Sequence, residues 1–274
     1  MASELMQQLD ETIGYIKNIY TPEASAGIIL GSGLGNLAQE IHNEKEISYN
    51  AIPHFPVSTV EGHTGKLIFG EIGGKKVIVM AGRFHFYEGY TPQQVAYPVR
   101  VMRLLGVNTL LLSNAAGGVN PGFIVGDLMI ITDHISFFTI NPLLGKNEEQ
   151  LGTRFPDMSE PYDKILIAKA KEIGKRLGYH LKEGVYTGVT GPTFETRAEY
   201  KLIKALGGDA VGMSTVQETI VAKHAGMRVF AVSVITDLGI REEENPITHE
   251  EVLAAAKEAE PKLTNLFKEL VKEI

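Results

Sequence analysis

The chain has 274 residues, of which 44% are hydrophobic and 22% are charged, as in an ordinary globular protein. A formal net charge of −7 argues against nucleic acid or an anionic membrane as the main partner, although a local basic pocket can still bind an anionic substrate. The chain has no cysteine, which excludes disulfides, thiolate nucleophiles and cysteine metal ligands. We find neither a signal peptide nor an apolar run of about 18 residues, so we expect a cytoplasmic enzyme.

Hydrophobic periodicity predicts a series of strands and helices that alternate along the chain. Helices are predicted at 5–20, 92–105, 165–177, 198–206 and 216–225, and a last one begins with a capping box at Thr248. Strands are predicted at 26–30, 66–69, 76–80, 109–113, 128–132, 184–190 and 228–236, the second and third of them as a hairpin. Residues 138–161, rich in Asn, Pro and Gly, are predicted to form a long surface excursion of the kind that is usually functional or binds a partner. The alternation, without a repeat or a shift in composition, predicts one α/β domain over residues 1–274 with a central sheet.

Arg83 and His85 follow a short β-branched run and lie two residues apart, so in extended chain they point the same way. A guanidinium and an imidazole that converge at a strand end suit a bound oxyanion, because both donate hydrogen bonds to it. The alternative is structural: an Arg paired with a nearby carboxylate and a His packed into the wall.

A glycine-rich turn, Gly31-Ser32-Gly33-Leu34-Gly35, follows the first predicted strand. It lacks the third glycine of a dinucleotide fingerprint, since Leu37 stands at that position. A strand, a glycine-rich turn and a helix start can still bind an anion on free N–H groups, with Ser32 beside them. The alternative is a tight turn that needs glycine only for its backbone.

Five further segments carry polar or small residues at strand ends or in loops. His63 lies in a glycine-flanked loop, where a surface histidine is the simpler interpretation, and the segment 114–118 (NAAGG) lets a ligand approach the backbone closely. Phe194 and Glu195 offer an aromatic platform beside a carboxylate, as recognition of a purine requires, although Glu195 could simply favour a helix N-terminus. The segment 211–215 (VGMST) offers hydroxyl groups for a ligand, although its Ser or Thr could simply cap the following helix. Asp237 ends the most apolar strand of the chain, a position at which α/β sheets commonly bind ligands.

Six of these motifs, in this order and at these spacings, resemble the trimeric class of purine nucleoside phosphorylases. They are GSGLG, STVEGHTG, GRFHFYEGY, SNAAGG, GPTFET and VGMST, and the match runs from about residue 28 to the C-terminal helix. The resemblance implies a single domain with a central mixed β-sheet flanked by helices, a homotrimer, and reversible phosphorolysis of purine ribo- and deoxyribonucleosides in purine salvage. It implies inorganic phosphate as co-substrate and no metal or organic cofactor.

The resemblance also implies a role for particular residues. It implies that phosphate is bound by Ser32, His63, Arg83, His85, the backbone N–H of Ala115, and Ser214. It implies that Tyr87, Met213 and His249 contact the sugar and that Phe194, Glu195 and Asp237 contact the base. It also implies that Phe155 reaches into the site of a neighbouring subunit. It implies His85, Glu195 and Asp237 as the catalytic residues.

Asp237 departs from the family, which usually has Asn at this position. An Asn amide can donate to N7 of the base, whereas an ionised Asp can only accept. Asp237 must therefore take up a proton to donate, or else face a donor such as a 6-amino group. The leading expectation is cleavage of inosine, guanosine and their deoxy forms. The alternative is a phosphorylase that prefers adenosine or 5′-methylthioadenosine, against which Glu195 and the polar His249 argue.

Two readings from other classes remain. A nucleoside hydrolase would use water, so the predicted anion-binding residues would have no purpose. A purine-binding module without activity would not need a second anion site beside the base. Activity with and without phosphate separates both from a phosphorylase.

Overall fold

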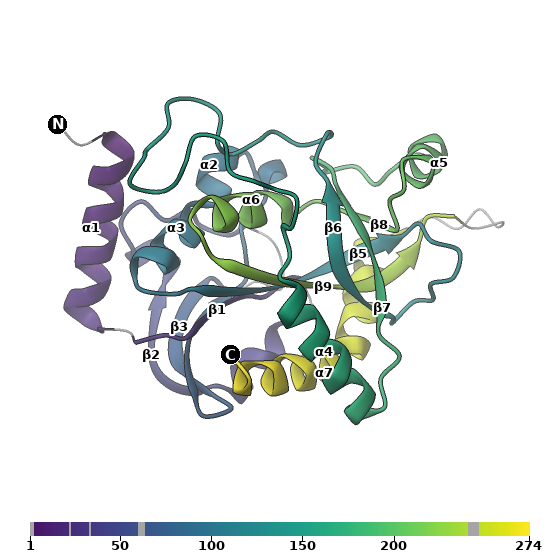
Figure 1. Cartoon of the computed structure of the whole chain (residues 1–274), viewed down its shortest axis with the longest axis horizontal. Helices are drawn as coiled ribbons and strands as arrows, with labels where there is room; N and C mark the ends of the chain where they lie inside the picture. The colour runs from purple at the N-terminus through teal and green to yellow at the C-terminus, as the bar shows by residue number, and fades with distance from the viewer. Residues whose placement is uncertain (1–2, 22, 33, 60–63, 241–246) are drawn as a thin grey trace.

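The computed structural model describes residues 3–21, 23–32, 34–59, 64–240 and 247–274 (Figure 1). Within these ranges, nine strands form one mixed sheet in the order β2-β3-β4-β1-β5-β8-β7-β6-β9. The strands are β1 (Ala26–Ile29), β2 (His42–Ser48), β3 (Lys66–Ile72), β4 (Lys75–Ala81), β5 (Thr109–Gly118), β6 (Leu128–Ile135), β7 (Lys182–Gly188), β8 (Ala210–Gly212) and β9 (Arg228–Leu238). Because β5 also pairs with β9, the strands β5, β8, β7, β6 and β9 form a closed ring of paired strands.

Helices cover both faces of this sheet. They are α1 (Glu4–Ile19), α2 (Pro92–Val95), α3 (Tyr97–Leu104), α4 (Lys164–Leu177), α5 (Arg197–Ala205), α6 (Val216–His224) and α7 (His249–Lys272). Three short 3₁₀ helices are η1 (Gly35–Glu40), η2 (Tyr49–Ala51) and η3 (Phe86–Glu88). In Figure 1, α1, α2, α3 and α6 lie on one side and α4 and α7 on the other. Among the described helices, none is both long enough and apolar enough to cross a membrane.

The central strands are apolar throughout because successive side chains enter two different cores. In β4, Ile78 and Met80 pack into the core beneath α1, α3 and α6. Val77 and Val79 pack into the core beneath α4 and α7. Side chains alternate across a strand, so a strand that is covered on both faces reads as a continuous apolar run. The α/β fold and the mixed sheet that the sequence predicts are confirmed.

Two predicted elements differ most from the structure, while several other strands differ in their bounds by two or three residues. The helix predicted at 92–105 is two helices, because Pro98 lies in the first turn of α3 and has no N–H to continue the ladder of α2. The strand predicted to end at Ser113 continues to Gly118, because its last residues pair with both β8 and β9. Hydrophobic periodicity does not predict β2, which is a polar edge strand, or β8, which has three residues.

Candidate active site

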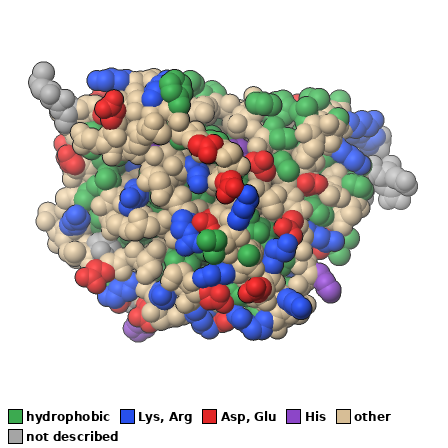
Figure 2. Space-filling view, in the orientation of Figure 1, with side chains coloured by type: hydrophobic (Ala, Val, Ile, Leu, Met, Phe, Trp, Pro, Cys, Tyr) green, Lys and Arg blue, Asp and Glu red, His purple; other side chains and the backbone are tan. Residues whose placement is uncertain are grey.

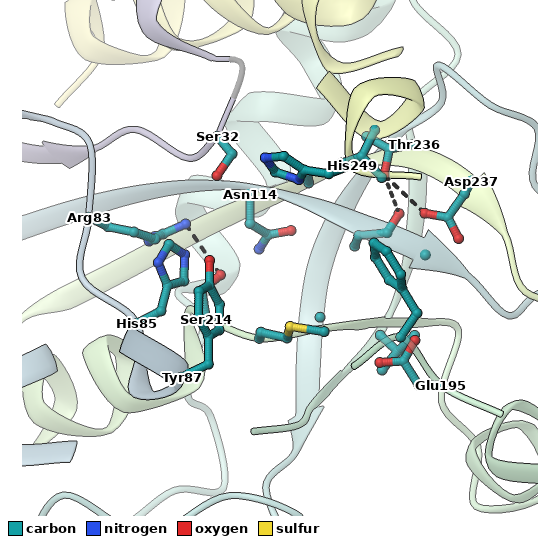
Figure 3. A pocket seen from close by; sticks show the side chains of 18 of the residues that line it. Ser32, Arg83, His85, Tyr87, Asn114, Glu195, Ser214, Thr236, Asp237 and His249 are labelled. Carbon is teal, nitrogen blue, oxygen red and sulfur yellow. Dashed lines mark hydrogen bonds between the residues drawn. The ribbon is translucent and has the colours of Figure 1, made fainter. Parts of the chain in front are cut away.

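A pocket opens beyond the carboxyl ends of β1, β4, β5, β8 and β9. Ligands of α/β proteins commonly bind at this edge of the sheet. The predicted site residues that line the pocket are Ser32, Arg83, His85, Tyr87, Ala115, Phe194, Glu195, Met213, Ser214, Asp237 and His249. Figure 3 shows that Arg83, His85 and Ser214 lie at one end and Glu195 and Asp237 at the other. The pocket therefore has a basic end with hydroxyl groups and an acidic end.

Ser32 reaches the pocket because the chain packs very closely where β1 ends. The Gly31 N–H donates to the Ser113 side chain, with an N–Oγ distance of 3.2 Å. A Cβ atom on Gly31 would lie 2.8 Å from the Ser113 carbonyl oxygen, too close for any larger residue. The turn continues into η1 rather than into an α-helix, and the Glu260 carboxylate on α7 accepts hydrogen bonds from the backbone and side chain of Asn36. This packing fixes the turn against β5.

Arg83 is almost completely buried and is anchored on several sides. Its Nε donates to Glu218 on α6 at 2.9 Å, and one terminal nitrogen donates to the Ser113 carbonyl at 2.5 Å. The same nitrogen lies 3.4 Å from Ser214 Oγ. The structural interpretation of Arg83 is thus correct in part, because a carboxylate does pair with it. The guanidinium nevertheless lines the pocket, so its charge is presented in a fixed orientation.

His85 is held by Glu88, three residues further along the chain. The Glu88 carboxylate accepts from the His85 backbone N–H at 2.8 Å and lies 3.0 Å from the ring Nδ1. Burial lowers the pKa of His85, assisted by the Arg83 charge, while Glu88 opposes this shift. Tyr87 stacks on the imidazole at a centroid distance of 4.7 Å, and burial raises the pKa of its phenol to about 12.

The turn after β8 places Ser214 in the pocket through an unusual backbone conformation. Thr215 has a φ of 71°, which is rare for a β-branched residue and occurs mainly at functional sites. Asn114 Nδ2 donates to the Thr215 hydroxyl at 2.8 Å and so supports this conformation from β5. Asn114 Oδ1 is buried at the pocket and has no hydrogen-bond partner among the described residues.

A bulge in β9 turns two consecutive side chains into the pocket. Ala116 pairs with Ile235 and Gly117 pairs with Asp237, which leaves Thr236 as an extra residue. In a regular strand, neighbouring side chains point to opposite faces, but Thr236 and Asp237 both line the pocket. The Thr236 hydroxyl donates to Asp237 Oδ1 at 3.1 Å.

Glu195 is half-buried in the loop before α5. Burial raises the pKa of its carboxyl group, and the nearby charge of Asp237 acts in the same direction. The Tyr200 side chain opposes this shift and lowers the pKa of Glu195. Met213 packs against Gly191 at the start of this loop, where a Cβ atom would lie 2.3 Å from the Met213 sulfur.

One predicted residue that the structure describes, Phe155, does not line the pocket of this chain. His63 falls outside the described residues. Phe155 is 86% exposed and lines a separate cavity between the segment after β6 and the long excursion. His249, in contrast, is the first residue of α7 and lines the pocket, and Thr248 caps this helix as predicted.

Several residues that shape the site have no role predicted from the sequence: Glu88, Asn114, Tyr200, Glu218 and Thr236. Glu88 lies in the motif GRFHFYEGY and Asn114 in SNAAGG, so their place in the sequence could have indicated a role in the site. Glu218 and Tyr200 come from helices, and only the tertiary fold brings them to the strand ends. No group of three or more His, Asp or Glu residues suited to hold a metal occurs among the residues described.

Comparisons with known proteins agree with this geometry. A sequence profile of the Phosphorylase superfamily matches residues 25–272. The chain is 50% identical over 267 residues to purine nucleoside phosphorylase 1 of Bacillus subtilis (strain 168), a match that covers 97% of this chain and 98% of that protein.

Solved structures show the same fold. The crystal structure of a schistosomal purine nucleoside phosphorylase in complex with hypoxanthine has a TM-score of 0.93 and 39% identity, and covers 100% of this chain and 99% of that one. A Schistosoma mansoni purine nucleoside phosphorylase in complex with adenosine has a TM-score of 0.93 and 40% identity, and covers 98% of each chain. The chain therefore belongs to the phosphorylase superfamily, and within it to the purine nucleoside phosphorylases.

Proposed function

We propose that this enzyme transfers the pentose of purine ribo- and deoxyribonucleosides to inorganic phosphate, reversibly, in purine salvage. The products are the free base and the pentose 1-phosphate. The observation that carries the proposal is the division of one pocket into a basic end and an acidic end, as Figure 3 shows. Phosphate needs positive charge and hydrogen-bond donors, while the N1–H and 2-amino groups of a purine need acceptors, so the two ends suit the two reactants on opposite sides of the sugar.

The basic end suits a phosphate held beneath C1′ of the sugar. Ser32, Ser214 and the Ala115 N–H supply neutral donors, and Arg83 supplies a fixed positive charge. Because Glu218 and the Ser113 carbonyl already orient Arg83, its charge needs little reorganisation when phosphate binds. A neutral His85 ring that donates from Nδ1 to Glu88 can act as a hydrogen-bond acceptor at Nε2 toward a monoprotonated phosphate.

The acidic end suits the leaving base. Breaking the C1′–N9 bond leaves negative charge on the purine, and catalysis requires that this charge be stabilised more strongly in the transition state than in the ground state. Glu195 would accept the N1–H of a 6-oxopurine and the 2-amino group of guanine. Asp237 would donate to N7 when it is protonated. Phe194 would pack on the base, while Tyr87, Met213 and His249 would contact the sugar.

We propose that the reaction needs no metal or organic cofactor, because phosphate is itself the nucleophile. We further propose a homotrimer in which Phe155 reaches the pocket of a neighbouring subunit. Its 86% exposure supports this, since large apolar side chains in contiguous exposed patches usually mark an interface. A cytoplasmic location belongs to the same proposal, and the absence of cysteine from the sequence fits a reducing compartment.

Asp237 supports a second candidate function, which differs from the first in the preferred base. The leading proposal is inosine and guanosine with their deoxy forms, because Glu195 suits a base that carries N1–H. The alternative is a preference for adenosine or 5′-methylthioadenosine, because an ionised Asp237 would accept from a 6-amino group.

The experiment is turnover of inosine, guanosine and adenosine with and without inorganic phosphate, with free base and ribose 1-phosphate as the readouts. We expect phosphate-dependent release of base from inosine and guanosine. Release from adenosine alone would favour the alternative assignment of the base site. Release without phosphate, and without ribose 1-phosphate, would overturn phosphorolysis in favour of hydrolysis.

A further inference from the structure

Glu260 is a buried acidic residue of α7 that makes a two-fold contact with the start of η1. Its exposed fraction is 2%, and it is not among the described residues that line the pocket. Its Oε1 accepts from the Asn36 backbone N–H, and its Oε2 accepts from Asn36 Nδ2 at 2.5 Å. The two residues lie 224 positions apart in the sequence. Both oxygens of one carboxylate therefore join α7 to a single residue of η1.

Apolar side chains surround this contact. Leu34, just before η1, and Leu37, within it, share a buried core with Leu263 of α7. Apolar burial is non-directional, so it holds the two elements together without fixing how one is shifted or rotated on the other. A buried carboxylate costs stability unless its oxygens are hydrogen-bonded, so the Glu260 carboxylate favours the one register in which Asn36 faces it. The Asn36–Glu260 pair thus fixes the position of η1 on α7.

The position of η1 determines the position of the glycine-rich turn that precedes it. The Gly31 carbonyl accepts from the Leu34 N–H at 3.1 Å and closes the turn in which Ser32 lies, two residues before Asn36. Ser32 lines the pocket. The Asn36 N–H is a donor at a helix start, but Glu260 accepts from it. The turn therefore presents Ser32 to the pocket while a carboxylate of the protein itself holds the helix start.

We propose that Glu260 is a positioning residue for phosphate: through Asn36 it holds the turn that presents Ser32 at the basic end of the pocket. The inference rests on the proposed function and deepens it by naming a residue outside the pocket that sets the affinity for phosphate. The charge of Glu260 repels phosphate, because both are negative. Any favourable effect of Glu260 on phosphate binding therefore comes from geometry and not from charge.

The test is Glu260→Ala, which removes both acceptors and one negative charge. Displacement of Ser32 should raise the KM for phosphate roughly fivefold to tenfold, the effect of losing one hydrogen bond. Loss of the charge alone would lower this KM, so the sign of the change separates the two causes. The kcat at saturating phosphate and the KM for inosine should stay within about twofold, because the lost interaction binds phosphate and not the nucleoside.

The matched control is Glu40→Ala. Glu40 is the last residue of η1 and accepts from Lys268 of the same helix α7 at 2.8 Å, but this ion pair is exposed. The control removes a carboxylate from the same contact between η1 and α7, at the end of η1 away from Ser32. Its KM for phosphate should stay within about twofold of the wild type, because exposed ion pairs contribute little. Equal KM values for phosphate in Glu260→Ala and Glu40→Ala would overturn the proposal.

The conservative variant Glu260→Gln separates hydrogen bonding from charge. It removes the same charge as Glu260→Ala but keeps an acceptor for the Asn36 N–H, and its amide can donate to Asn36 Oδ1 when the Asn36 amide turns over. We expect the KM for phosphate to return to within about twofold of the wild type. A KM raised as far as in Glu260→Ala would overturn the proposal.

A variant at the other end of the contact does not disturb the core, because Asn36 is exposed. Asn36→Ala removes the side-chain donor and leaves the backbone hydrogen bond in place. We expect the KM for phosphate to rise roughly threefold, less than in Glu260→Ala, because one of the two hydrogen bonds remains. If Glu260→Ala did not fold, this variant would decide, and an unchanged KM for phosphate would overturn the proposal.

A separate measurement keeps this result distinct from the proposed function. If the wild-type enzyme released no base in the presence of phosphate, the proposed function would fail independently of Glu260. Binding of inorganic phosphate, measured by calorimetry on the full chain, would then decide the inference. Binding to Glu260→Ala that is weaker by about fivefold or more would support it. Equal binding by the two proteins, or no binding by the wild type, would overturn it.

Discussion

Acidic side chains determine how the functional groups of the pocket are presented. Glu218 holds Arg83 at 2.9 Å, and Glu88 holds both the backbone and the ring of His85. Removing either carboxylate would leave a basic group in place but without its orientation. The sequence motifs identified Arg83 and His85, because they lie two positions apart after a strand. They did not identify Glu218, which lies 135 positions from Arg83.

Asp237→Asn is the substitution that tests the preferred base most simply. An Asn amide donates to N7 without first taking up a proton, so we expect turnover to shift towards inosine and guanosine relative to adenosine. A gain of one favourable hydrogen bond corresponds to roughly a fivefold to tenfold change in the ratio of kcat/KM values. The measurement is that ratio in the variant and in the wild type at one pH. An unchanged ratio would show that residue 237 does not read the base.

Glu88 gives a pH dependence of stability whose sign follows from its pKa. Burial alone would raise this pKa, but hydrogen bonds from His85 and Thr59 outweigh it and lower the value to about 2. A carboxyl with a lowered pKa stabilises the fold above its unfolded pKa of about 4.5 and loses this contribution as the pH falls towards 2. The contribution is on the order of 3 kcal/mol.

The variant Glu88→Gln should therefore differ most from the wild type in unfolding free energy near pH 6, and the difference should shrink on acidification to pH 3. Urea denaturation at several pH values measures it. Glu46→Gln is the control, since Glu46 forms an exposed ion pair with Lys66 that contributes less than about 1 kcal/mol. A difference between Glu88→Gln and the wild type that stays constant from pH 6 to pH 3 would contradict this account.

At the scale of elements, the pocket depends on where strands end and how closely they pack. The sequence predicts the ends of β1, β4 and β9 to within two residues, because apolar runs stop just before Ser32, Arg83 and Asp237, but it does not predict the end of β5. It does not predict the bulge at Thr236, because an extra residue in a strand is defined only by its partner strand. It also misses the polar edge strand β2, which lacks the apolar alternation that marks a half-buried strand.

The glycine-rich turn after β1 offers a prediction with a matched control inside the same motif. Gly31→Ala would place a Cβ atom 2.8 Å from the Ser113 carbonyl oxygen, so β1 and β5 must move apart. We expect a loss of roughly 1–3 kcal/mol in unfolding free energy and a higher KM for phosphate. Gly35→Ala meets nothing within 4 Å and should change both quantities little. Equal effects of the two substitutions on phosphate KM would argue against this role of the turn.

At the scale of the whole molecule, the face seen in Figure 2 has a charged region and an apolar region. Figure 2 shows Lys, Arg, Asp and Glu side chains intermixed over α4 and α7, while hydrophobic side chains gather above β6 and towards α5. The exposed apolar residues in the segment after β6 and in the long excursion include Phe137, Leu144 and Phe155. The sequence predicted an excursion here from composition, but only the structure shows how exposed its aromatic residues are.

The proposed homotrimer predicts that Phe155 acts on the nucleoside and not on phosphate. In Phe155→Ser we expect KM for inosine to rise roughly tenfold, which corresponds to loss of one well-packed aromatic contact. KM for phosphate should stay within about twofold. Sedimentation should give a mass of three chains for the wild type. Ile165→Ser, which replaces a residue that is 62% exposed on α4, is the control.

A monomeric wild type that turns over inosine at full rate would exclude a site completed by a neighbouring subunit. An unchanged KM for inosine in a trimeric Phe155→Ser would exclude the contribution of this side chain.

The central claim is that one pocket binds phosphate at its basic end and a purine at its acidic end. The most direct measurement is a crystal structure of the enzyme with inorganic phosphate and hypoxanthine. The account predicts phosphate within hydrogen-bond distance of Ser32, His85 and Ser214, and the base between Glu195 and Asp237. Phosphate bound outside the pocket, or a base seated against Arg83 and His85, would contradict it.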